Sequence, residues 1–209
     1  MTHMILVRHG ATEWNAAKRA QGQADIPLNE DGIRQAKETA ERLAGSEIAA
    51  VYSSDLLRAT ATAARIAEAH DLEVRIDPAF REIDQGDWEG VETEQIRRRW
   101  PELWGDARHW KPRPNGESPA QVRARGLEGI RRIVEAHPEG TVVVVSHGGT
   151  IRWLSAEAMG YDDRASSRLR GVANGGAVAL DARIHGGELV LENLVRHDGR
   201  ATDLDDPND

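Results

Sequence analysis

The chain has 209 residues and no cysteine. Disulfide bonds, thiolate metal sites and cysteine nucleophiles are therefore excluded. No apolar run approaches the roughly 18 residues that mark a membrane-spanning helix, and no Gly-x-x-x-x-Gly-Lys stretch is present to cradle the phosphates of a nucleotide. The first apolar run, residues 5–7, has no basic flank and is too short for a signal peptide. We therefore expect a cytoplasmic protein with no membrane partner.

Acidic residues outnumber basic ones: Asp and Glu total 35 against 27 Lys and Arg, for a formal net charge of -8. Such a chain lacks the net positive charge that attracts duplex nucleic acid, so we expect no nucleic-acid partner. Lysine supplies only three of the basic residues, so the other 24 are arginines. This bias suits small anionic ligands, because arginine binds carboxylates and phosphates bidentately, although genome composition alone can produce it.

Short apolar runs alternate with segments of helical periodicity, such as the one containing Ile33, Ala36 and Ala40. The predicted strands are 4–7, 48–52, 72–76 and 141–145, and the predicted helices are about 30–44, 55–70, 118–136 and 150–159. Residues 177–180 and 189–194 are expected to pair across Gly186-Gly187. This order predicts the α/β class: a three-layer α/β/α sandwich with a mainly parallel central sheet and a terminal antiparallel strand pair.

Turn and capping residues support these boundaries. Ser118-Pro119-Ala120-Gln121 is a predicted capping box with proline at the first helical position. Ser53-Ser54-Asp55 is expected to supply the cap of the helix that follows it. Asn174-Gly175-Gly176 is expected to form a turn before a late strand.

The length fits one domain, and the sequence contains no repeat or linker. We predict a single domain over residues 1–197, with a cap-like segment at about 78–117, and an acidic disordered tail over 198–209. The cap-like segment holds four of the six tryptophans, which we expect to form its core. Its basic residues 97–99 are predicted to form a solvated helix face. Some of the basic residues of this segment could meet a second anionic group of a ligand, such as a carboxylate; they are Arg97, Arg98, Arg99, His109, Lys111 and Arg113.

Two predicted strands end in a histidine followed by glycine, at His9-Gly10 and His147-Gly148. If these strands are parallel neighbours, both imidazoles lie at the carboxyl edge of the sheet, where ligands bind in open α/β folds. Arg8 precedes the first histidine, and Arg58 lies about one turn into a helix whose N-terminus also favours an anion. Two arginines and two histidines suit a doubly charged, oxygen-rich group, and phosphate fits best.

A histidine held among phosphate-binding cations can also act as a nucleophile toward phosphorus, with the arginines stabilising charge on the phosphoryl oxygens. The departing alkoxide then needs a proton. Glu82 follows the third predicted strand and is the candidate acid, with Asp84 and Glu89 as alternatives.

Five segments in order resemble the histidine phosphatase superfamily, in its phosphoglycerate mutase-like branch, over roughly residues 4–195. They are LVRHGATEWN at 6–15, QG with LNEDG between 21 and 32, SSDLLRATATA at 53–63, REIDQGDWEG at 81–90 and SHGG at 146–149. The resemblance implies a phosphoglycerate mutase-like fold and a site that uses no metal and no cofactor.

The resemblance also implies a role for each site residue. His9 would carry the phosphoryl group transiently, and Glu82 would protonate the leaving oxygen and then activate the attacking water. The phosphoryl group would be held by Arg8, Arg58 and His147. The substrate-binding residues would be Asn15, Gln21, Gly22 and Gly148.

The segment GDWEG at 86–90 resembles the phosphatase branch. We therefore expect metal-independent hydrolysis of a small phosphomonoester through a phosphohistidine intermediate. The alternative is a cofactor-dependent phosphoglycerate mutase, and a third hypothesis is a non-catalytic phospho-binding module. The expected partner is a small phosphorylated metabolite, and the expected assembly is a homodimer.

Overall fold

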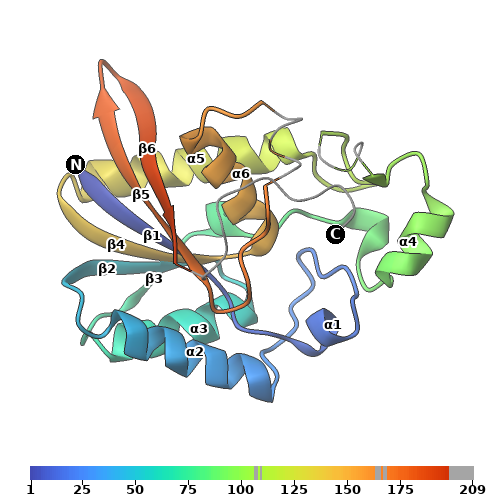
Figure 1. The fold of residues 1–209 in the computed structure, drawn as a ribbon, viewed down its shortest axis with the longest axis horizontal. Helices are drawn as coiled ribbons and strands as arrows, with labels where there is room; N and C mark the ends of the chain where they lie inside the picture. Colours follow the sequence, from blue (N-terminus) through green and yellow to red (C-terminus); the bar gives the residue numbers. More distant parts are fainter. Residues whose placement is uncertain (106–107, 109, 163–165, 167–168, 198–209) are drawn as a thin grey trace.

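The computed structural model describes residues 1–105, 108, 110–162, 166 and 169–197. Its centre is a six-stranded sheet with the strand order β3-β2-β4-β1-β5-β6 (Figure 1). The strands are β1 (Thr2–Arg8), β2 (Ile48–Ser53), β3 (Val74–Ile76), β4 (Gly140–Ser146), β5 (Ala177–His185) and β6 (Glu188–Arg196). Strands β3, β2, β4 and β1 are parallel, whereas β5 and β6 are antiparallel additions. The predicted mainly parallel sheet with a terminal antiparallel pair is therefore confirmed.

Helices cover both faces of the sheet, which confirms the predicted three-layer sandwich (Figure 1). One face carries α2 (Glu30–Leu43) and α3 (Leu57–Glu68), and the other carries α5 (Pro119–Ala136) and α6 (Gly148–Ala158). The valines of β4 show why both layers are needed. Val143 and Val145 pack in the core beneath α2 and α3, whereas Val142 and Val144 pack beneath α5 and α6. A strand that is apolar on both faces is stable only when both faces are covered.

Local signals set most element boundaries. The Ser118 hydroxyl accepts from the backbone N–H of Gln121 at 3.3 Å, and the Gln121 side chain accepts from the backbone N–H of Ser118 at 2.8 Å, so the capping box is confirmed. One helix-face prediction is wrong: Ile33 is 53% exposed, because the buried stripe of α2 passes through Gly32, Ala36 and Ala40 instead.

Two loop predictions also need correction. The N-cap of α3 is Leu56, which makes no side-chain cap bond, while Ser54 bonds to His147 and Asp55 to Arg81. The segment 11–29, for which no helix or strand was predicted, contains the short helix α1 (Glu13–Ala16).

The cap-like segment contains two 3₁₀ turns, η1 (Pro78–Phe80) and η2 (Gly86–Trp88), and the helix α4 (Thr93–Arg99). In Figure 1, α1 and α4 lie beyond the carboxyl ends of β1 and β4. Trp88 is buried, with its ring centroid 6.2 Å from that of Trp100 and 5.9 Å from that of Trp104. Arg97, Arg98 and Arg99 are exposed, as predicted. The predicted tail, 198–209, lies outside the described residues, and no described helix is long and apolar enough to cross a membrane.

Candidate active site

The two His-Gly pairs meet at the carboxyl edge of the sheet. Strands β1 and β4 are parallel neighbours with Arg8 opposite Ser146, so His9 and His147 lie side by side. The backbone N–H of His9 donates to the carbonyl of Ser146 at 3.1 Å, and the two imidazole centroids are 5.0 Å apart. The expectation drawn from the two strand ends is therefore met.

His9 is only 3% exposed, and its Nδ1 lies 2.6 Å from the carbonyl oxygen of Gly10. A carbonyl oxygen only accepts, so Nδ1 must carry the proton and Nε2 keeps a free lone pair. Burial, and then the charges of Arg8 and Arg58, lower the pKa of His9 well below its ordinary value of 6.5. At neutral pH the ring is therefore a neutral imidazole with an unprotonated Nε2.

Arg58 projects from the first turn of α3 and is fully buried. Its Nη1 donates to the carbonyl of Ala24 and its Nη2 to the carbonyl of Gly22, each at 2.7 Å, and its Nε approaches Nδ1 of His147 at 3.3 Å. Burial lowers the pKa of Arg58, but an arginine side chain stays charged in a protein. Gly22 thus helps to orient the guanidinium through its carbonyl group.

His147 is fully buried, and its tautomer follows from its two partners. The Arg58 Nε is a donor only, so Nδ1 of His147 accepts and the proton of the neutral ring lies on Nε2. That Nε2–H donates to the hydroxyl oxygen of Ser54 at 2.9 Å. Burial, followed by the charge of Arg58, lowers the pKa of His147 well below 6.5. Ser54, which the sequence suggested only as a helix cap, is therefore part of the site.

Glu82 faces the N-terminus of α6. Its Oε2 accepts from the backbone N–H of Gly149 at 3.1 Å, and its Oε1 accepts from the N–H of Ile83 at 2.9 Å. Both alternative acids point elsewhere: Asp84 accepts from the N–H of Gly86, and Glu89 accepts from the N–H of Gln23. Glu82 lines a cavity at this edge of the sheet, whereas Asp84 and Glu89 do not.

The turn at 174–176 touches the site. Asn174 donates through Nδ2 to the carbonyl of His9 at 3.1 Å and approaches Oδ1 of Asn15 at 3.4 Å. Gly175 has a φ of 70°, which glycine adopts at little cost. Gln21 lies further along the same network, where its side-chain oxygen accepts from the Thr12 hydroxyl at 3.0 Å.

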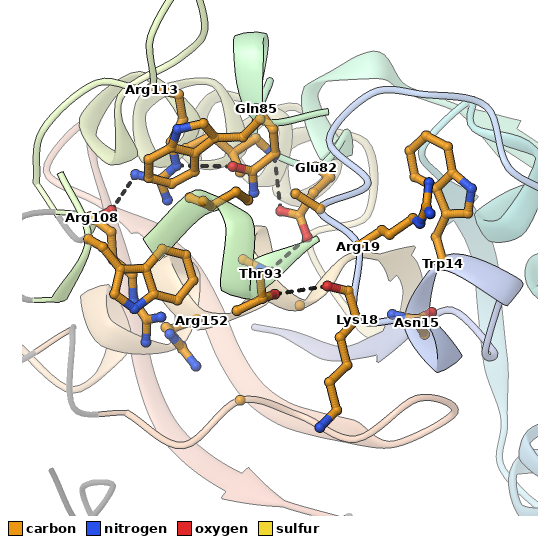
Figure 2. Close-up of a pocket in the computed structure, with 18 of the residues that line it drawn as sticks. Trp14, Asn15, Lys18, Arg19, Glu82, Gln85, Thr93, Arg108, Arg113 and Arg152 are labelled. Carbon is orange, nitrogen blue, oxygen red and sulfur yellow. Dashed lines mark hydrogen bonds between the residues drawn. The ribbon is translucent and has the colours of Figure 1, made fainter. Parts of the chain in front are cut away.

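A cavity of about 450 Å³ opens beside these residues (Figure 2). Four of the predicted site residues line it: Arg8, Asn15, Glu82 and Gly148. The aromatic part of its wall consists of Trp14, Trp88, Trp104 and Trp153, and its other cations are Lys18, Arg19, Arg108, Arg113 and Arg152. Most of these residues come from loops and from α6, so no local sequence signal placed them together. Among the described residues, no group of three or more His, Asp or Glu side chains is placed to hold a metal ion.

Comparisons with known proteins agree with this geometry. The family model described as histidine phosphatase superfamily (branch 1) matches residues 4–195. A phosphoserine phosphatase of Hydrogenobacter thermophilus is 39% identical over 78% of both chains, and a probable phosphoglycerate mutase of Proteus mirabilis is 36% identical over 81% of this chain and 80% of the relative. The solved mycobacterial glucosyl-3-phosphoglycerate phosphatase in complex with VO3 superposes with a TM-score of 0.84 and 32% identity, covering 92% of this chain and 96% of that one. The chain therefore belongs to the histidine phosphatase superfamily, branch 1.

Proposed function

We propose that the protein is a metal-independent phosphatase that hydrolyses a small phosphomonoester through a phosphohistidine on His9. One observation carries this proposal: a buried imidazole whose Nδ1–H is bonded to Gly10, leaving Nε2 as a neutral nucleophile beside Arg8 and Arg58. A lone pair that is available without prior deprotonation suits attack on phosphorus at neutral pH.

In the first half-reaction, Nε2 of His9 attacks phosphorus and the bond between phosphorus and the ester oxygen breaks. The leaving oxygen takes the proton of a protonated Glu82. In the second half-reaction, the Glu82 carboxylate takes a proton from water and the resulting hydroxide attacks phosphorus. The N–P bond then breaks, its electron pair returns to Nε2, and inorganic phosphate leaves.

The surrounding cations stabilise the charge that develops during both transfers. Arg8 and Arg58 would contact the equatorial phosphoryl oxygens, and His147, whose ring nitrogens are bonded to Arg58 and Ser54, would help to hold the group by positioning Arg58. Asn15, Gln21, Gly22 and Gly148 are proposed to line the phosphate end of the site. Because backbone carbonyls and a neighbouring ring already hold Arg58, little reorganisation is needed when the substrate binds.

The relatives favour hydrolysis over isomerisation. Two of the three proteins compared above are named as phosphatases, and one is named as a probable mutase. A non-catalytic role is disfavoured because nucleophile, acid and anion-binding groups are all present at one sheet edge. The single-domain boundaries, the cytoplasmic location and the homodimer stay predictions from the sequence.

The first test is phosphate release from a panel of small phosphomonoesters with EDTA present, with the same samples checked for isomerised phosphoglycerate. We expect EDTA-insensitive release without isomer. The His9→Ala variant should lose more than about 10³-fold in turnover while keeping its circular dichroism spectrum. Wild-type rates in that variant would rule out the phosphohistidine mechanism, and isomer with little free phosphate would identify a mutase.

A further inference from the structure

The cavity carries more positive charge than a phosphoryl group alone requires. Six of its lining residues are Arg or Lys, against Glu82 as the one carboxylate among them. Arg8 belongs to the phosphate end, and Arg19 is ion-paired with Glu92 at 3.2 Å. Arg113 differs from both, because it is buried in the wall that the cap-like segment contributes.

Arg113 is 7% exposed, and its guanidinium lies 5.0 Å from the ring centroid of Trp88. Its Nε donates to the side-chain oxygen of Gln85 at 3.1 Å and its Nη1 to the backbone carbonyl of Arg108 (Figure 2). Nη1 also donates to the backbone carbonyl of Lys111. All of these acceptors are neutral. Within the described part of the chain, no carboxylate lies within ion-pair distance of Arg113, and its Nη2 donates no hydrogen bond.

A buried cation without a counter-ion is costly, because desolvation is not offset by an opposite charge. Burial, and then the nearby charge of Arg108, lower the pKa of Arg113 to about 10. The side chain is therefore still charged at neutral pH. Neutral oxygens hold its geometry, and within the described residues Glu82 acts on its charge only at a distance, without an ion pair.

The backbone around Arg113 is held in place. The Arg113 N–H donates to the Glu117 carbonyl and closes a turn. Within this turn, the Asn115 side chain donates to both carboxylate oxygens of Asp87 at 3.1 Å. A Cβ on Gly116 would collide with the backbone of Asp84 and Gly86. The guanidinium thus lies in a preformed position, and a ligand that binds it pays little ordering entropy.

We propose that Arg113 binds a carboxylate on the leaving group, so that the substrates are phosphorylated organic acids. This inference rests on the proposed function and narrows it. One uncompensated guanidinium matches one unit of negative charge, which a carboxylate carries at neutral pH. Nε and Nη1 of Arg113 already donate to neutral oxygens, so within the described residues Nη2 is the donor left for such a carboxylate, to which it would give a charge-assisted hydrogen bond.

The test compares kcat/KM for 3-phosphoglycerate and glycerol 3-phosphate. Both are primary phosphate esters with a three-carbon chain. 3-Phosphoglycerate ends in a carboxylate, whereas glycerol 3-phosphate ends in a hydroxymethyl group. We expect wild type to prefer the acid by at least about ten-fold, since a hydrogen bond to a charged group contributes about 1.5–3 kcal/mol. Arg113→Gln should remove most of that preference by lowering kcat/KM for 3-phosphoglycerate. The kcat/KM for glycerol 3-phosphate should change less than about two-fold.

The matched control is Arg98→Gln, because Arg98 lies on the exposed face of α4, where it pairs with Glu94 at 3.1 Å. Arg98→Gln should leave kcat/KM unchanged for both substrates. Arg113→Lys should retain part of the preference for the acid. Equal hydrolysis of both esters by wild type, or equal loss of both in Arg113→Gln, would overturn the carboxylate assignment while leaving the phosphatase proposal intact. No phosphate release from any ester would overturn both.

Discussion

His147 shows how one hydroxyl group sets the state of a buried ring. Arg58 can only donate to Nδ1, so the ring proton must lie on Nε2, and Ser54 is its acceptor. Ser54 Oγ also accepts from the Leu56 N–H at 3.3 Å, which fixes the direction of its lone pairs. We therefore assign Ser54 as a positioning residue that acts through His147.

Replacing Ser54 by alanine would leave a buried N–H without a partner, at a cost of about 1–3 kcal/mol. We expect Ser54→Ala to lower kcat roughly ten- to hundred-fold with little change in KM, and Ser54→Thr to restore much of it. The ¹⁵N chemical shifts of His147 report the tautomer directly. A variant with unchanged shifts but reduced activity would assign Ser54 a packing role instead.

At the scale of elements, the turn from β4 into α6 holds the candidate acid. The N–H of Gly149 donates to Oε2 of Glu82 at 3.1 Å and so orients its carboxyl group. The structure explains why glycine occupies both positions. A Cβ on Gly148 would lie 3.3 Å from the Arg8 guanidinium, and one on Gly149 would collide with the Glu82 carboxylate and approach Trp153 at 2.9 Å.

Gly149→Ala should therefore displace Glu82 without removing it. Hydrolysis of alkyl phosphates, whose leaving groups need a proton, should slow by about 10²-fold. Hydrolysis of an aryl phosphate with a good leaving group should slow far less. Glu82→Gln should show the same pattern more strongly. Gly45→Ala is the control, because a Cβ there contacts nothing within 4 Å. Equal losses for both leaving groups in Glu82→Gln would move the acid role to another carboxylate.

At the scale of the whole molecule, burial of two neutral histidines couples stability to pH. The pKa values of His9 and His147 are both lowered, chiefly by burial. Their stabilising contribution is complete above the unfolded pKa near 6.5, because neither state then binds a proton. As the pH falls through the depressed folded pKa values, the unfolded chain binds protons that the folded chain excludes, and this contribution is lost.

We therefore expect the free energy of unfolding to fall between pH 7 and pH 5, by up to about 1.4 kcal/mol per pH unit for each buried histidine. Calorimetric Tm values across this range would measure the effect. His9→Gln should flatten the slope, whereas His185→Gln, at an exposed hairpin position, should not. A wild-type Tm that stays constant over this range would contradict buried, neutral histidines.

Periodicity and short motifs predicted the layers of this protein and the positions of its two His-Gly pairs at strand ends. The β4 valine run and the Ser118 capping box depend on neighbours within a few residues, so sequence alone located them. Ile33 was misplaced because several apolar stripes fit one short helix, and only packing against α3 and the sheet selects among them. The same limit applies to Ser54, whose partner His147 lies 93 residues away.

The sequence by itself determined the α/β class and the position of His9 and His147 directly after their strands, because both depend on local patterns, whereas the pairing of β1 with β4 that brings the two rings together is tertiary. Tertiary structure alone decided the tautomer of His147, the contact of Glu82 with the N-terminus of α6 and the neutral hydrogen-bond partners of Arg113 among the described residues. Each of these depends on atoms brought together from distant segments. Hydrogen-bond geometry and desolvation act over distances in space, and spacing along the chain does not record them.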